Sequence, residues 1–166
     1  MDTKFKNLKW QKQNYWFLLK SEEETLVTVN YKLGNKSLFS ISSVNYQLES
    51  KGFINQGLSV IANGQEVLEI KSGFFETKST LTFVDGTIVK QDFRHNGKLA
   101  LRYYNNEGDI LVYSYETIDR RIKETFSVGE VFIDAEKFLI LAALGIIIFT
   151  PFMLEINGCS DIITLI

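Results

Sequence analysis

The amino-acid sequence predicts a mainly β fold, in which roughly 10–12 antiparallel strands close into a barrel around one hydrophobic helix. Two observations predict it. Alternating segments separated by Gly, Asn and Asp recur about every ten residues over 25–133, which is typical of antiparallel strands and hairpins. The stretch Asp134–Leu154 then contains no charged residue from Phe138 onward, and nothing earlier in the chain resembles it.

Composition and charge exclude several classes of protein. The chain has 166 residues, 45% of them hydrophobic, and we expect a single domain over 1–166. A formal net charge of −2 gives no reason to expect nucleic acid as a partner. Cys159 is the only cysteine, so an internal disulfide and a cysteine-based zinc site are excluded. The first ten residues lack the apolar core of a secretion signal, so we expect a cytoplasmic location, with or without association with a membrane. The oligomeric state is left open.

Residues 1–24 combine lysines with aromatic side chains. The lysines are Lys4, Lys6, Lys9, Lys12 and Lys20, and Asp2 is the only acidic residue within 1–20, before the acidic run Glu22–Glu24. Basic and aromatic residues together are typical of segments that lie on a membrane surface. The alternative is an N-terminal arm or first strand in which Tyr15–Leu19 cover one end of a core. We favour this alternative, because Trp and Phe are strong strand formers.

Strands are predicted throughout 25–133, and three hairpins are the clearest among them. They span 58–71, 80–93 and 98–116. Asn63-Gly64 and Asp85-Gly86 are read as two-residue turns, since both central residues of a type I′ turn need positive φ. A last strand over 122–128 leads towards the helix.

The predicted helix, about 135–150, has its own start and stop signals. Asp134 is a good N-cap residue. Glycine inside a helix destabilises it by about 1 kcal/mol relative to alanine. A glycine at position 145 is therefore understandable if a strand or another side chain approaches the helix closely there. Pro151 removes a backbone donor, so we expect the helix to kink or end around Thr150. Asn157-Gly158 is the latest plausible stop.

The apolar run 138–154 has two alternative placements. At 1.5 Å per residue it covers roughly 25 Å, slightly less than the hydrocarbon core of a bilayer. Its flanks carry neither a Lys/Arg cluster nor a Trp/Tyr belt. We therefore favour a helix enclosed by the strands, followed by a tail over 155–166. The alternative is a membrane-anchored protein, with a single transmembrane helix at 138–154 and a cytoplasmic β domain.

In this order of segments the chain resembles the Tubby C-terminal-like superfamily, which includes the LURP-one-related and phospholipid-scramblase-like proteins. The resemblance is carried by the three hairpins, by Phe126–Val131 and by the apolar run Phe138–Ile148. It implies a barrel of about twelve strands around a central hydrophobic helix. Some members of the superfamily bind phosphoinositide headgroups on a basic patch, others are linked to lipid scrambling, and many have no known activity, so the resemblance implies no specific role. Because the sequence contains no catalytic constellation, we expect a non-enzymatic domain. Calcium binding is not carried over, because residues 119–134 lack closely spaced carboxylates.

The candidate site is accordingly a lipid- or anion-binding surface, with a membrane lipid or a protein as partner. The candidate residues are Lys4, Lys6, Lys9, Lys12, Arg120, Arg121 and Lys123. Arg94, Lys98 and Arg102 are also close in sequence, but we expect them to be ordinary solvent-facing charges. His95, the only histidine, has no nucleophile beside it, and no metal or cofactor motif is present, so no catalytic residue is predicted.

Overall fold

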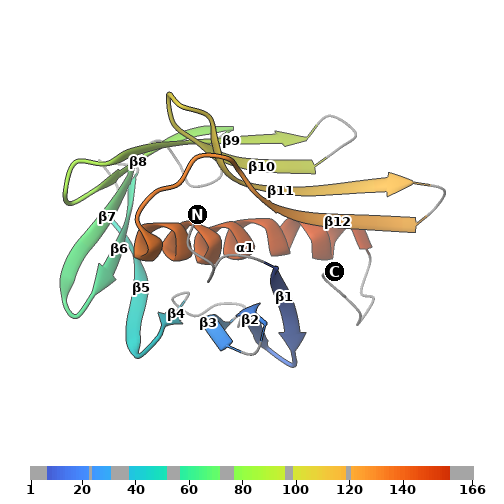
Figure 1. Cartoon of the computed structure of the whole chain (residues 1–166), viewed down its shortest axis with the longest axis horizontal. Coiled ribbons are helices and arrows are strands. Elements are labelled where there is room, and N and C mark those ends of the chain that lie inside the picture. Colours follow the sequence, from blue (N-terminus) through green and yellow to red (C-terminus); the bar gives the residue numbers. More distant parts are fainter. Residues whose placement is uncertain are drawn as a thin grey trace.

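The computed structural model describes residues 7–22, 24–30, 38–51, 57–71, 77–95, 99–118 and 121–157. Twelve strands form one antiparallel sheet in which every strand pairs with its neighbours in sequence. The sheet curls into a nearly closed barrel around a single helix (Figure 1). The predicted fold class is therefore confirmed.

The strands are short and are joined mostly by tight turns. Their bounds are β1 Leu8–Gln13, β2 Trp16–Ser21, β3 Glu24–Asn30, β4 Leu38–Ile41, β5 Val44–Ser50, β6 Gly57–Ala62, β7 Gln65–Lys71, β8 Lys78–Phe83, β9 Ile88–His95, β10 Leu99–Tyr104, β11 Asp109–Ile118 and β12 Arg121–Val128. The helix α1 spans Ala135–Asn157.

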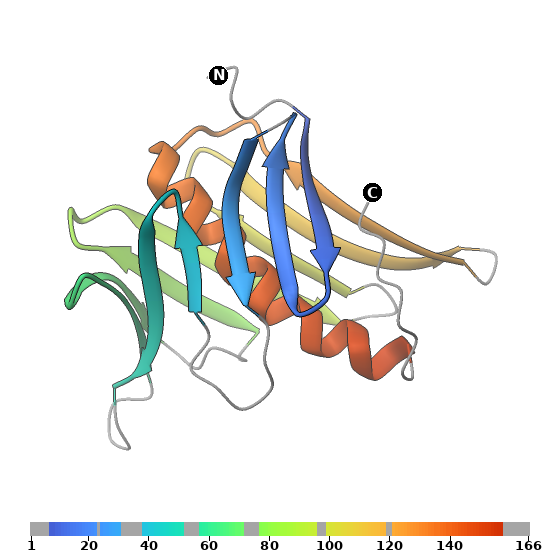
Figure 2. The same ribbon diagram turned by 90° about the horizontal axis from the view of Figure 1, so that it is seen from below.

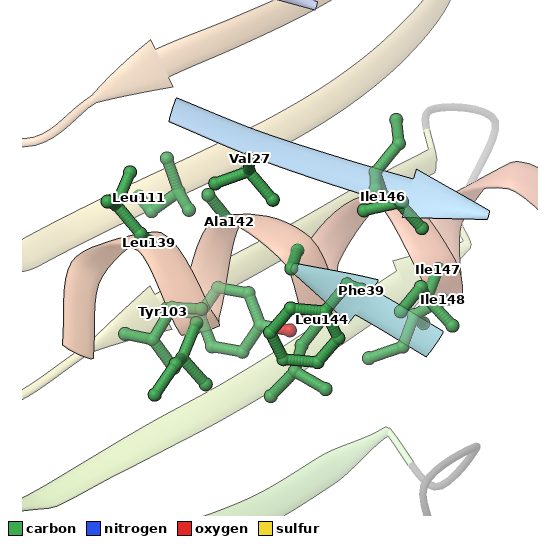
Figure 3. Close-up of a cluster of buried hydrophobic side chains, with 14 of the residues drawn as sticks. Val27, Phe39, Tyr103, Leu111, Leu139, Ala142, Leu144, Ile146, Ile147 and Ile148 are labelled. Atoms are coloured by element: carbon green, nitrogen blue, oxygen red, sulfur yellow. The ribbon is translucent and has the colours of Figure 1, made fainter. Parts of the chain in front are cut away.

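The helix α1 fills the interior of the barrel. Strands β8–β12 lie on one side of it and β1–β4 on the other (Figures 1 and 2). Every residue from Phe138 to Thr150 is buried. Side chains from both walls, such as Val27 and Tyr103, meet the helix in one hydrophobic cluster (Figure 3). A helix that is apolar all round must be buried, and here the strands bury it.

No helix among the described residues combines the length and the apolar character that crossing a membrane requires.

Two hairpin turns show how turn chemistry sets strand register. Asn63 and Gly64 have φ of 52° and 76°, and Ala62 pairs with Gln65, as a two-residue turn requires. In the next hairpin the backbone N–H of Phe83 donates to Thr87, so three residues, 84–86, form the loop. The loop is therefore one residue longer than the two-residue turn predicted at Asp85-Gly86, and that prediction is wrong. A two-residue type I′ turn needs positive φ at both central residues, and here only Gly86 takes it.

The start of α1 is as predicted, and its end is the later of the two that the sequence offers. The Asp134 carboxylate accepts the backbone N–H groups of Glu136 and Lys137, at 3.0 and 3.3 Å, as an N-cap does. The helix then continues through Pro151 to Asn157, which is the later of the two predicted ends. Proline removes a single backbone donor, and the residues from Phe138 to Thr150 that precede it are buried.

Gly145 lies against the ring of Tyr113, which confirms the expected close approach. A Cβ at this position would lie 2.8 Å from both Cδ2 and Cζ of that ring, closer than packed atoms come. The Tyr113 hydroxyl donates to the Ala142 carbonyl at 2.7 Å, so the ring is fixed against the helix.

The barrel has one seam, between the end strands β1 and β12. No backbone ladder joins these two strands within the described residues. Side chains close the seam instead. Trp10 Nε1 donates to the Tyr113 hydroxyl at 3.0 Å. The Trp10 ring also lies edge-on to the Phe126 ring, with 6.4 Å between the ring centroids. The seam is thus bridged by an aromatic cluster that also contacts α1.

Candidate functional site

The hairpin formed by β1 and β2, which we call the aromatic hairpin (residues 8–21), exposes two large aromatic side chains at its turn. Tyr15 is 73% exposed and Trp16 is 44% exposed. The turn is tight, and within it Asn14 takes a positive φ of 54°, a conformation that Asn tolerates better than most residues. Trp16 pairs directly with Gln13 across it. The two rings are therefore displayed by local backbone geometry.

Alternation along β2 explains which side chains point outward. Phe17 and Leu19 are buried against the core, so Trp16, Leu18 and Lys20 occupy the opposite face of the strand. The expectation that Tyr15–Leu19 cover the core holds for Phe17 and Leu19 but not for Tyr15 and Trp16. The alternation itself, with a turn at Asn14-Tyr15, was the signal that would have shown this.

The lysines of the aromatic hairpin do not share one face. Lys9 is exposed and lies opposite Lys20 in the register of β1 with β2. Lys12 is half-buried and lies on the same side of β1 as the buried Trp10. Lys9 and Lys20 thus form the basic part of the outer surface, with Tyr15 and Trp16 at its far end.

The other predicted site residues are placed only in part. Lys4, Lys6 and Arg120 lie outside the described residues. Arg121 and Lys123 lie on β12, where their partners in the register are Ile118 and Glu116. Because β1 and β12 border the same seam, the structure brings the strands of the two predicted basic groups near each other, although they are distant in sequence.

Polar contacts fix the N-terminal end of α1 to the barrel wall. The Tyr46 hydroxyl donates to Glu136 Oε1 at 2.6 Å, and burial with this contact raises the pKa of Tyr46 well above its ordinary value. Lys137 forms an ion pair with Asp85 and donates to Thr87 at 3.0 Å. The hydrogen bond from Lys137 and those from Thr87 lower the pKa of Asp85 to about 2. These groups hold the start of the helix against the barrel wall.

Groups that could hold a metal ion are absent from the part of the chain that the structure describes. The side chain of His95 and the whole of Cys159 lie outside that part. Comparison with protein-family models, with curated proteins and with solved structures finds no match. The function must therefore be inferred from the geometry of the chain itself.

Proposed function

We propose that this protein is a non-enzymatic, Tubby-like barrel that binds anionic membrane surfaces through the aromatic hairpin. One observation carries the proposal: Tyr15 and Trp16 are displayed at a tight turn, on a hairpin whose outer face carries Lys9 and Lys20. The Tubby-like assignment is part of the proposal and is supported by a barrel that encloses a C-terminal helix.

The chemistry of the hairpin suits a membrane interface. Trp and Tyr have an apolar ring and a polar tip, and they gather at the level of lipid headgroups. Lysines near an anionic surface contribute about 1 kcal/mol each at moderate salt. Two aromatic side chains and two lysines give a reversible contact that depends on lipid charge.

An external site also follows from the way the interior is filled. The residues of α1 from Phe138 to Thr150 occupy the position that a ligand inside a barrel would take. Binding is therefore expected on the outer surface.

Flotation with vesicles tests the proposal. We expect wild-type protein to float with phosphatidylcholine vesicles that contain phosphatidylserine, and much less with phosphatidylcholine alone. The double variant Tyr15→Ser/Trp16→Ser removes only exposed side chains, so it should fold normally and lose flotation. Lys9→Glu/Lys20→Glu should lose the dependence on phosphatidylserine.

A matched control removes two exposed apolar side chains elsewhere. Val84 and Ile88 are 73% and 55% exposed at the turn between β8 and β9. The variant Val84→Ser/Ile88→Ser should float like the wild type. Equal flotation of the wild type and Tyr15→Ser/Trp16→Ser would refute the proposal.

A further inference from the structure

A second surface lies on the outer side of β8, β9 and β10, across α1 from the aromatic hairpin (Figures 1 and 2). We call it the basic face. Its charged residues are Lys78, Lys90, Asp92, Arg94 and Arg102, together with Asp109 at the adjoining start of β11. Lys78 and Arg102 lie opposite Asp92 on the two neighbouring strands, and Lys90 lies opposite Tyr104. Strand pairing thus gathers cations that the sequence separates.

At the centre of the basic face a buried carboxylate holds an exposed guanidinium. The Asp92 side chain is 6% exposed, whereas that of Arg94 is 66% exposed. Arg94 donates to one Asp92 oxygen from Nε at 2.9 Å and from Nη2 at 2.7 Å. The hydrogen bonds to Asp92 raise the pKa of Arg94. A guanidinium oriented in this way loses little freedom when it binds a second anion.

The remaining cations add to an excess of positive charge. Arg102 forms an ion pair with Asp109 and lies over the Tyr104 ring, 4.7 Å from its centroid. Lys78 and Lys90 form no ion pair among the residues described. Four cations against two carboxylates leave two uncompensated positive charges on this face, although the whole chain carries −2.

An apolar anchor borders the basic face. Ile88 lies two residues before Lys90 on the same side of β9, and Val84 precedes it in the turn. Cations beside exposed aliphatic side chains fit a polypeptide that offers both carboxylates and an apolar side chain better than they fit a small inorganic anion.

We infer that the basic face binds an acidic, extended segment of a protein partner. Side chains two apart on a strand are about 6.6 Å apart, which equals the spacing of alternate residues in an extended peptide. Carboxylates at alternate positions of the segment pair with Lys90, Arg94 and the cations on β8 and β10. An apolar residue at its end packs on Ile88 and Val84.

The test uses a fluorescein-labelled synthetic peptide with glutamate at alternate positions and leucine at one end, measured by fluorescence anisotropy at low salt. The control peptide has glutamine in place of glutamate. We expect the acidic peptide to bind and the control peptide not to bind. Lys78→Glu/Lys90→Glu should weaken binding by roughly tenfold or more, and Val84→Ser/Ile88→Ser should weaken it by several fold.

Two comparisons separate this inference from the proposed function. Lys9→Glu/Lys20→Glu makes the same change of charge on the opposite wall, so it should leave peptide binding unchanged and impair flotation. Equal peptide affinity of the wild type and Lys78→Glu/Lys90→Glu would overturn the inference. The inference would also be overturned if Lys78→Glu/Lys90→Glu abolished flotation on phosphatidylserine vesicles, because the basic face would then be a lipid site. Circular dichroism of each variant confirms that the barrel is intact.

Discussion

Replacing Gly145 by alanine sets two effects of known size against each other. In an exposed helix the change would stabilise the protein by about 1 kcal/mol, because glycine loses more backbone freedom on folding. In this protein the new Cβ would lie 2.8 Å from two atoms of the Tyr113 ring. The ring cannot turn away without breaking its hydrogen bonds to Trp10 and Ala142.

The packing cost is expected to exceed the gain in helix propensity. Overpacking of a core typically costs about 1–3 kcal/mol, and this clash is at the upper end because the helix interior and the barrel wall are both fixed. The expected net effect is a loss of about 1–2 kcal/mol. For a chain of this length that corresponds to a fall in Tm of roughly 2–8 °C.

Urea unfolding monitored by tryptophan fluorescence measures this effect, and a double-mutant cycle identifies its cause. In a Tyr113→Val background the ring is absent, so Gly145→Ala should raise stability by about 1 kcal/mol. If Gly145→Ala stabilises the protein that retains Tyr113, the reasoning is refuted, because the helix and β11 are then not in close contact.

Two further predictions concern polar groups. Lys137 lowers the pKa of Asp85 to about 2. The ionised Asp85 carboxylate therefore contributes its full stability above its ordinary pKa of 3.8, and this contribution is lost as pH falls towards 2. Thermal melts from pH 5 to pH 2 should show a smaller acid-induced fall in Tm for Asp85→Asn than for the wild type. Gln91 has a side-chain amide that is buried without a hydrogen-bond partner among the described residues, so Gln91→Leu should raise the free energy of unfolding by about 1–2 kcal/mol. If urea unfolding instead gives Gln91→Leu a lower free energy of unfolding than the wild type, the prediction is wrong, and a buried water pairs with this amide.

The overall architecture was accessible from sequence because it depends on local signals. Alternating residues predict strands, glycine and asparagine predict turns, and each strand pairs with its neighbour in the chain. The order of strands in the sheet therefore required no choice among distant partners. Local signals did not decide between the two ends of α1 that the sequence offers, near Thr150 and at Asn157, because whether a helix stops at a proline depends on its tertiary context.

The candidate surfaces were predicted less well, for two different physical reasons. Tyr15 is exposed because it lies in the turn, and Trp16 because the alternation of β2 directs it outward, a distinction lost when Tyr15–Leu19 are treated as one covering segment. The basic face depends on register across three strands, and the one-residue error in the turn at 84–86 would have moved Lys78 to the wrong partner. Grouping charges by nearness in sequence identifies Arg94 and Arg102 but not the lysines across the sheet.

The position of α1 at the end of the strand order has a consequence for biosynthesis. A ribosome produces all twelve strands before it produces the helix that they enclose. Until then the inward-facing side chains of the strands have nothing to pack against, and chains in this state are prone to aggregate. A nonsense mutation just before Ala135 should therefore yield a polypeptide with every strand and no core, which cells would direct to chaperones and proteases. A helix that is translated after every strand it contacts thus decides whether those strands fold.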